Sequence, residues 1–216
     1  PLAKVLLGGD GGDELFLGYE RYAAARALHA ARESPVLRAA AGRMPLVGHP
    51  KSLASKLGRW CQAVAGRGYE DLVAVFPSWS AQRLFPEWVN VVGNEPPADP
   101  ASAAAARDWE LPGHFRSVLL RKIDHASMLA QVEFRAPFLA GPLADAALAL
   151  PGSILTPRGR PKALLRSLVR TTIPGEGGAI ARRRKSGFAI PLSDWFRRDF
   201  GGLGSAVADL LGSADP

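Results

Sequence analysis

Three acidic residues in a glycine-rich turn are the first feature of this chain that could support chemistry. The segment Gly8–Glu14 reads GGDGGDE and directly follows the short apolar run Val5–Leu7. A short apolar run that ends in glycines is typical of a buried, parallel strand. A strand, a glycine turn and a helix start together direct backbone N–H groups and a positive dipole end toward an anion. Because carboxylates repel phosphates, Asp10 and Asp13 suggest a bridging Mg²⁺ ion.

The same acids also have a purely structural interpretation. Asp13 would be the N-cap of the following helix, and Glu14 would be favoured in its first turn. That interpretation leaves the glycines on both sides of Asp10 unexplained. The spacing matches neither the GxGxxG fingerprint nor a Walker loop. The segment is therefore consistent with two interpretations, a nucleotide site with Mg²⁺ and a simple helix start.

A second segment, residues 119–152, combines an amphipathic helix with a turn. The helix is expected over Phe115–Gln131, and the turn at Ala136-Pro137, because proline disfavours helix for the residue before it. Glu133 and Arg135 lie two residues apart where this helix is expected to end. On their own they favour a structural ion pair.

A third segment, residues 181–196, reads ARRRKSGFAIPLSDWF and carries consecutive cations from Arg182 to Lys185. Such a run is most often a solvated surface. Gly187, Phe188 and Pro191 would, however, hold this loop against a core, which favours an anionic ligand for the cations. Lys185 is the cation nearest to this anchor.

Taken together, these segments resemble the C-terminal synthetase domain of glutamine-dependent asparagine synthetases. The resemblance spans about Lys4 to Phe196 and rests on KVLLGGDGGDELFLGYERY, RKIDHASMLAQVEFRAPFLA, KALLR and RRRKSGFAIPLSDWF. The same domain serves related amidotransferases and β-lactam synthetases, so the resemblance indicates the chemistry better than the substrate. It departs from the family pattern at His125, where Arg or Lys is usual, and at Ala140, where Asp is common.

The resemblance implies ATP-dependent amide formation. A substrate carboxylate is adenylated by ATP, and ammonia then displaces AMP. It assigns Asp10 and Lys185 to catalysis and Asp13 to Mg²⁺. The implied nucleotide-binding residues are Gly8, Gly9, Gly11 and Arg183. Aspartate or another small carboxylate is the expected acceptor, and glutamine-derived ammonia would come from an N-terminal domain outside this chain.

The expected fold is α/β and similar to the adenine-nucleotide α-hydrolases, with this chain mainly helical and keeping a remnant of the parallel sheet. Residues 1–200 are expected to form the C-terminal part of the synthetase-type domain, with a surface connector near 93–106 and a tail over 201–216. The family's pyrophosphate loop and glutaminase domain are expected upstream of Pro1. The chain alone is therefore expected to be inactive, and a non-catalytic remnant is an alternative.

The composition of the chain argues against other classes of protein. The net charge is +7, and the cations concentrate late in the 216-residue chain, which suits a polyanion. A basic nucleic-acid-binding module is the rival, but no zinc spacing, RNP aromatics or GXXG loop supports it, so we expect no nucleic-acid partner. No apolar run approaches the roughly 20 residues of a membrane span, so no membrane is expected either.

The single cysteine, Cys61, suits a reducing compartment such as the cytoplasm. A homodimer is compatible with these expectations.

Overall fold

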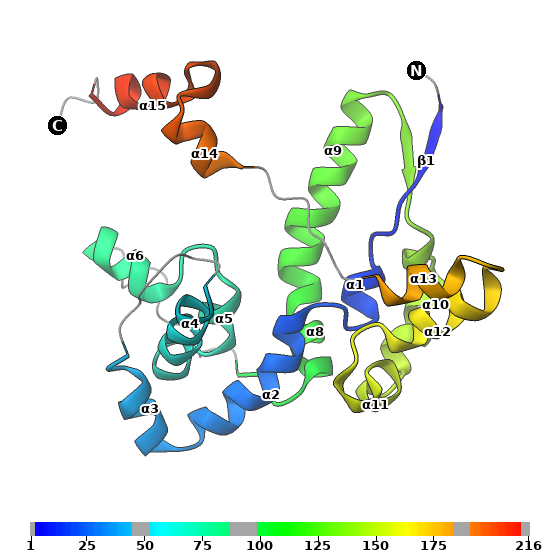
Figure 1. The fold of residues 1–216 in the computed structure, drawn as a ribbon, viewed down its shortest axis with the longest axis horizontal. Coiled ribbons are helices and arrows are strands. Elements are labelled where there is room, and N and C mark those ends of the chain that lie inside the picture. The colour runs from blue at the N-terminus through cyan, green and yellow to red at the C-terminus, as the bar shows by residue number, and fades with distance from the viewer. Residues whose placement is uncertain (1–2, 45–51, 87–98, 184–190, 213–216) are drawn as a thin grey trace. The chain divides into compact units, whose positions relative to one another are not determined.

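A computed structural model describes residues 3–44, 52–86, 99–183 and 191–212 (Figure 1). The chain divides into two compact units, Pro1–Ala181 and Arg182–Pro216. Each unit is described by itself. The domain boundary expected at residue 200 stays a prediction.

The first unit is mainly helical. Its N-terminal half contains β1 (Val5–Leu7), α1 (Gly12–Leu15), α2 (Glu20–Arg32), α3 (Pro35–Ala41), α4 (Leu53–Ala65), α5 (Tyr69–Val73) and α6 (Ser78–Leu84). Its C-terminal half contains α8 (Ala103–Glu110), the π-helix η2 (Leu111–Leu120), α9 (Arg121–Leu129), β2 (Glu133–Arg135), η3 (Pro137–Leu139), α10 (Gly141–Ala149), α11 (Gly152–Leu155), η4 (Pro157–Gly159), α12 (Ala163–Thr172) and α13 (Gly177–Arg182).

The second unit is short. It contains α14 (Leu192–Arg197), the 3-10 turn η5 (Phe200–Gly202) and α15 (Leu203–Gly212). Most of the tail expected over 201–216 is thus helical. Across the described ranges of both units, no helix has the length and apolar character needed to cross a membrane.

The strand expected before the glycine turn is confirmed as β1, and its pairing is parallel. β1 runs beside β2 with Leu6 opposite Phe134. The expectation of a buried strand was wrong, because Leu6 is 54% and Leu7 is 69% exposed. Within the described residues the sheet has two strands, and helices do not bury both of its faces as they do in a typical parallel sheet. The chain is therefore α/β, mainly helical, with a small parallel sheet.

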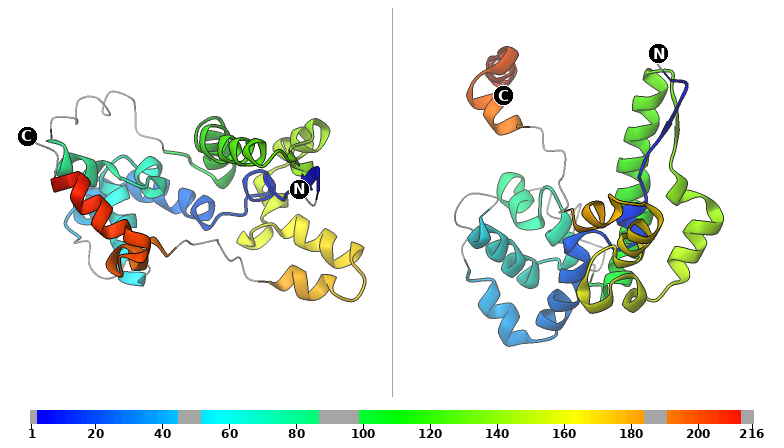
Figure 2. Two further views of the ribbon diagram at one scale, coloured as in Figure 1. Left: turned by 90° about the horizontal axis from the view of Figure 1, so that it is seen from above. Right: turned by 45° about the vertical axis from the view of Figure 1, so that its right-hand side comes forward.

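The chain segment Glu133–Arg135 was not predicted as a strand. It was expected at the end of a helix, yet it forms β2. The long helix does end nearby, at Leu129 in α9. In Figure 2, β2 leaves the end of α9 and turns back along β1.

The segment Glu14–Ala31 is rich in alanine, leucine and arginine and has few helix breakers, which predicts one continuous helix, and this prediction is wrong in one place. The structure has two helices, α1 and α2, because Leu17 adopts a left-handed conformation with φ of 52°. The break allows Leu17 to be buried to 1% exposure. Burial of a leucine side chain is worth about 2 kcal/mol, which offsets the strained backbone.

The surface connector expected near 93–106 stays a prediction. Residues 93–98 lie outside the described residues, while Ala103–Ala106 form the start of α8. The side chain of Ser102 caps this helix by accepting a hydrogen bond from the Ala105 amide at 3.1 Å. Alanine has the highest helix propensity, so a serine cap followed by alanines begins a helix here.

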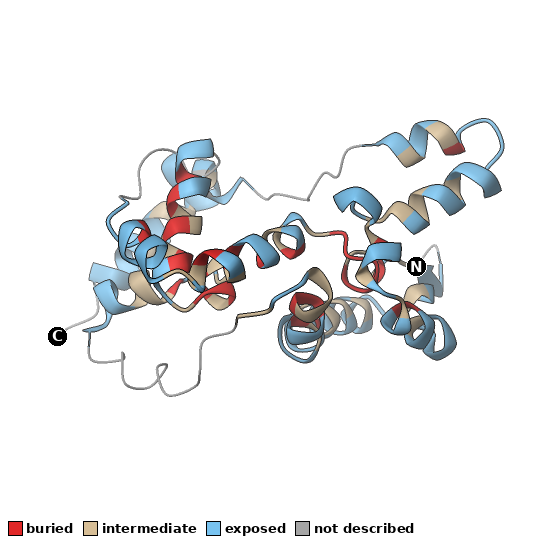
Figure 3. Cartoon of the chain, turned by 90° about the horizontal axis from the view of Figure 1, so that it is seen from below, coloured by how far each residue is buried: buried red, intermediate tan, exposed pale blue. Residues whose placement is uncertain are grey.

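The hydrophobic core lies where α2 packs against α4 and α8, and the buried residues follow α1, α2 and α4 (Figure 3). Tyr22 on α2 and Tyr69 on α5 are among the most buried side chains. Both donate hydrogen bonds to Glu110 at the end of α8. Arg21 binds the same carboxylate through two hydrogen bonds of 2.7 and 2.6 Å. This buried polar cluster joins three helices that are distant in sequence.

Candidate active site

The glycine turn leads from β1 directly into α1. The Gly8 amide still belongs to the sheet, because it donates to the Arg135 carbonyl at 2.9 Å. The turn then closes with the Gly12 amide donating to the Gly9 carbonyl at 3.2 Å. Two residues after Gly9, the Gly11 carbonyl accepts a hydrogen bond from the Leu15 amide, and α1 begins. The turn is thus short and fixed at both ends by backbone hydrogen bonds.

The glycines of this turn do not all serve the same purpose. A side chain at Gly8 would place its Cβ 2.0 Å from the Phe134 ring. Gly11 has a φ of 88°, and a Cβ there would lie 2.5 Å from Leu139. Gly8 therefore allows the turn to pack on β2, and Gly11 allows it to pack on η3. A Cβ at Gly9 would meet nothing within 4 Å, so only Gly9 of these three is open to a ligand.

We predict that two alanine substitutions in this turn affect different properties, one the stability of the fold and the other the binding of ATP. Gly11→Ala should lower the free energy of unfolding by about 1–3 kcal/mol, since it combines left-handed backbone with a steric clash. Gly9→Ala should leave thermal stability unchanged and weaken ATP binding. Thermal melts and nucleotide titrations of both variants check this. Destabilisation by Gly9→Ala equal to that by Gly11→Ala would contradict the assignment.

Asp13 lies in the first turn of α1, and its carboxylate forms an ion pair with Lys162. The distance from Lys162 Nζ to Asp13 Oδ1 is 2.9 Å, and both side chains are partly buried. Gly18 makes room for the pair, because a Cβ there would lie 2.1 Å from the Asp13 oxygen and 2.4 Å from Lys162 Cε. The N-cap of α1 is Gly11. The interpretation of Asp13 as an N-cap was therefore wrong.

Lys162 is the site residue that the sequence analysis missed. It is the first residue of the KALLR segment. Its backbone has a φ of 53°, a conformation uncommon for lysine. From this backbone conformation, the Lys162 ammonium group reaches Asp13, which lies far earlier in the chain.

The donor set around Asp13 limits the kind of metal site that it could form. Among the described residues, no group of three His, Cys, Asp or Glu side chains could hold a metal ion. Mg²⁺, however, commonly uses one or two carboxylates together with substrate phosphates. Asp13 and Asp10, both partly exposed on the turn, fit an ion shared with phosphates. Binding there requires the Asp13 carboxylate to be shared with, or released by, Lys162.

The other two acids of the segment have distinct surroundings. Asp10 Oδ2 lies 2.9 Å from the position of a Gly8 Cβ, so its side chain folds back over the turn. Glu14 is 5% exposed and accepts a hydrogen bond of 2.6 Å from the Tyr19 hydroxyl. Burial and this hydrogen bond raise the pKa of Tyr19 above its ordinary value. Glu14 therefore orders the start of α2, and Asp10 and Asp13 are the acids with access to solvent.

The second sequence segment packs against the glycine turn, which the sequence analysis did not predict. Glu133 and Arg135 form the expected ion pair at 2.8 Å, with both side chains about 60% exposed (59% and 61%). The hydrogen bond from Arg135 lowers the pKa of Glu133. Phe138 packs on Phe16 with ring centroids 5.8 Å apart. This contact helps hold the turn against η3.

The cationic segment belongs to the other unit. Lys185 lies outside the described residues. Arg183 is exposed and follows the end of α13. The roles of Lys185 and Arg183 therefore stay predictions. Of the positions that depart from the family pattern, His125 is exposed on α9 and Ala140 is the N-cap of α10.

Comparison with known proteins decides the family. A family model described as asparagine synthase matches residues 2–215. The chain belongs to the asparagine synthase family. Its relatives include a putative glutamine-hydrolysing asparagine synthetase of Mycobacterium bovis, 28% identical over 212 residues that cover 90% of this chain and 31% of that protein. A protein of the same description from Mycobacterium tuberculosis H37Rv gives the same values.

A third relative shares a shorter stretch. Asparagine synthetase 1 (glutamine-hydrolysing) of Bacillus subtilis is 31% identical over 84 residues, or 39% of this chain and 13% of that protein. No solved structure matches the chain significantly. The chain spans about a third of the length of the Mycobacterium relatives, 31% in each case. The glycine turn and Lys162 both lie within the residues that the asparagine synthase model matches.

Proposed function

We propose that this chain is the C-terminal, nucleotide-binding part of a ligase that forms amides with ATP. The acceptor carboxylate attacks the α-phosphorus of ATP, which gives an acyl-adenylate and pyrophosphate. Ammonia then attacks the acyl carbon, and AMP leaves. Aspartate is the first acceptor to test, because relatives of the chain are named asparagine synthetases. Ammonia would be derived from glutamine by a separate domain.

The observation that carries this proposal is the glycine turn with its paired acid. Gly9 offers an open backbone surface beside partly exposed carboxylates. Asp13 and Lys162 place opposite charges 2.9 Å apart at the same turn. The Asp13 carboxylate can bind a cation, and the Lys162 ammonium group can bind a phosphate.

Each residue has a stated role in this scheme. Gly9 brings the backbone to the nucleotide, Gly8 and Gly11 let the turn adopt the packing that exposes it, and Arg183 supports the phosphates. Asp10 faces the adenylate and the attacking amine. Asp13 holds Mg²⁺, which when bound neutralises charge on the departing pyrophosphate. Lys185 stabilises the charge that develops in the transition state.

The test is carboxylate-dependent exchange of labelled pyrophosphate into ATP by the full-length protein. Exchange that requires aspartate, with asparagine formed when ammonia or glutamine is added, supports the proposal. Exchange that requires a different small carboxylate supports a related amidotransferase. Absence of exchange with every carboxylate, in a protein that still binds ATP, would identify a non-catalytic remnant and overturn the proposal.

Lys185 gives a sharper test against the nucleic-acid alternative. Lys185→Ala should lower kcat/KM at least about tenfold, or roughly 1.4 kcal/mol of barrier. Arg182→Ala is the matched control and should have little effect, because Arg182 is exposed at the end of α13. Small, equal effects of both variants, together with tight and salt-sensitive DNA binding, would favour a nucleic-acid-binding surface instead.

A further inference from the structure

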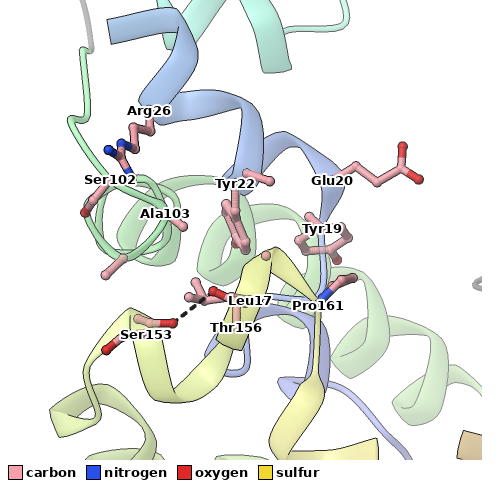
Figure 4. A pocket seen from close by; sticks show the side chains of 14 residues that line it. Leu17, Tyr19, Glu20, Tyr22, Arg26, Ser102, Ala103, Ser153, Thr156 and Pro161 are labelled. Carbon is pink, nitrogen blue, oxygen red and sulfur yellow. Dashed lines mark hydrogen bonds between the residues drawn. The ribbon is translucent and has the colours of Figure 1, made fainter. Parts of the chain in front are cut away.

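A cavity of about 570 Å³ lies in the first unit, and no residue of Gly8–Glu14 lines it. Its walls come from one face of α2, the first turn of α8 and the segment 152–161 (Figure 4). Its volume falls within the range of about 300–1,000 Å³ that is usual for small-molecule sites. Neither Asp10 nor Asp13 lines it. The residues that line the cavity are therefore different from those proposed to bind the nucleotide, although Pro161 directly precedes Lys162.

One end of the cavity is apolar. Leu17, Tyr22 and Pro161 line it, and Figure 4 shows the Tyr22 ring directed toward Leu17 and Thr156. The Tyr22 hydroxyl is already bound to Glu110 at 3.3 Å. Its ring, and not its hydroxyl group, is thus the part available to a ligand. A flat apolar or aromatic group suits this end.

The other end of the cavity is positive. Arg26 lies one helical turn after Tyr22, on the same face of α2, and its side chain lies beside Ser102 (Figure 4). In the described part of the chain, the Arg26 guanidinium has no ion pair and no hydrogen bond. Ser102 begins α8, so the positive end of that helix lies at the same place. Glu20 also lines the cavity, but its carboxylate is directed away from Arg26 (Figure 4). A charged guanidinium that lines a cavity without an acidic partner favours an anion.

We propose that this cavity binds a small organic anion, with its acidic group at Arg26 and an apolar or aromatic body against Tyr22. A carboxylate and a phosphate share the chemistry that Arg26 recognises. The site is independent of the proposed function, because no residue of the glycine turn takes part. Its ligand is an additional small molecule and not the nucleotide.

The test is isothermal titration calorimetry of the full-length protein, without ATP, using phenylacetate, phenyl phosphate and the uncharged phenylacetamide. We expect saturable binding of phenylacetate or phenyl phosphate, and binding of phenylacetamide at least about tenfold weaker. The tighter of the two anions identifies the preferred acidic group. Absence of saturable binding by either anion, or equal binding of phenylacetamide, would overturn the proposal.

Variants locate the binding in the cavity. Arg26→Ala should weaken the anion at least about tenfold, or roughly 1.4 kcal/mol. Ala104→Phe should remove binding by filling the cavity while leaving Arg26 in place. Arg38→Ala, at an exposed arginine of α3 outside the cavity, is the control and should bind as the wild type does. Equal affinities in all these variants would show that the anion binds elsewhere, and circular dichroism checks that each variant is folded.

Discussion

Replacing Asp13 with asparagine is expected to lower the rate of amide formation about 10²–10³-fold in the full-length protein. Asparagine keeps the shape of the side chain and therefore the packing against Gly18. It removes the charge that holds Lys162 at 2.9 Å and that would bind Mg²⁺. The measurements are pyrophosphate exchange and asparagine formation over a Mg²⁺ titration. Asp145→Asn, at an exposed acid on α10, is the control and should leave both unchanged.

Lys162→Met separates the two roles of Asp13. If Asp13 binds Mg²⁺, Asp13→Asn raises the Mg²⁺ concentration for half-maximal rate, whereas Lys162→Met does not. If Asp13 serves only to position Lys162, both variants lose rate equally and keep the wild-type Mg²⁺ requirement. Wild-type rates with an unchanged Mg²⁺ requirement in Asp13→Asn would remove Asp13 from the site.

The local parts of the site could be predicted from the sequence. An apolar run followed by glycines gave the position of β1 and the start of α1 near Gly12. The ion pair between Glu133 and Arg135 was also predictable, because its partners lie only two residues apart. These features depend on neighbours in the chain. Short-range chemistry is enough to specify them.

The long-range parts could not be predicted in the same way. The strand β2 exists because Glu133–Arg135 pairs with β1, more than a hundred positions earlier, and its own pattern looked like a helix end. The same holds for Lys162, whose role depends on meeting Asp13 in space. The separate purposes of Gly8 and Gly9 likewise become visible only when Phe134 is placed beside the turn.

The cluster around Glu110 gives the largest expected effect on stability. Glu110 is 3% exposed and accepts hydrogen bonds from Arg21, Tyr22 and Tyr69. Burial, followed by the interactions with Glu110, raises the pKa of both tyrosines, so they stay neutral donors. The Arg21 side chain is 28% exposed. Most of the cluster is thus shielded from water, and the charges of Arg21 and Glu110 stabilise each other.

Glu110→Gln should lower the local free energy of unfolding by about 3–5 kcal/mol. The amide keeps the shape but leaves the Arg21 charge without its partner in a largely buried place. Native-state hydrogen exchange of the α2 and α8 amides, in the full-length protein, measures this loss directly. Glu133→Gln is the control, since it breaks an exposed pair and should have no detectable effect.

A double variant tests the physical reason. Adding Arg21→Met to Glu110→Gln removes the unpaired charge and replaces it with an apolar side chain that can pack on Tyr19, where the guanidinium now lies 3.9 Å from the ring centroid. The double variant should therefore be more stable than Glu110→Gln alone, with a coupling of about 1–3 kcal/mol. A double variant that is less stable than either single variant would mean that the hydrogen-bond geometry, and not the unpaired charge, accounts for the loss.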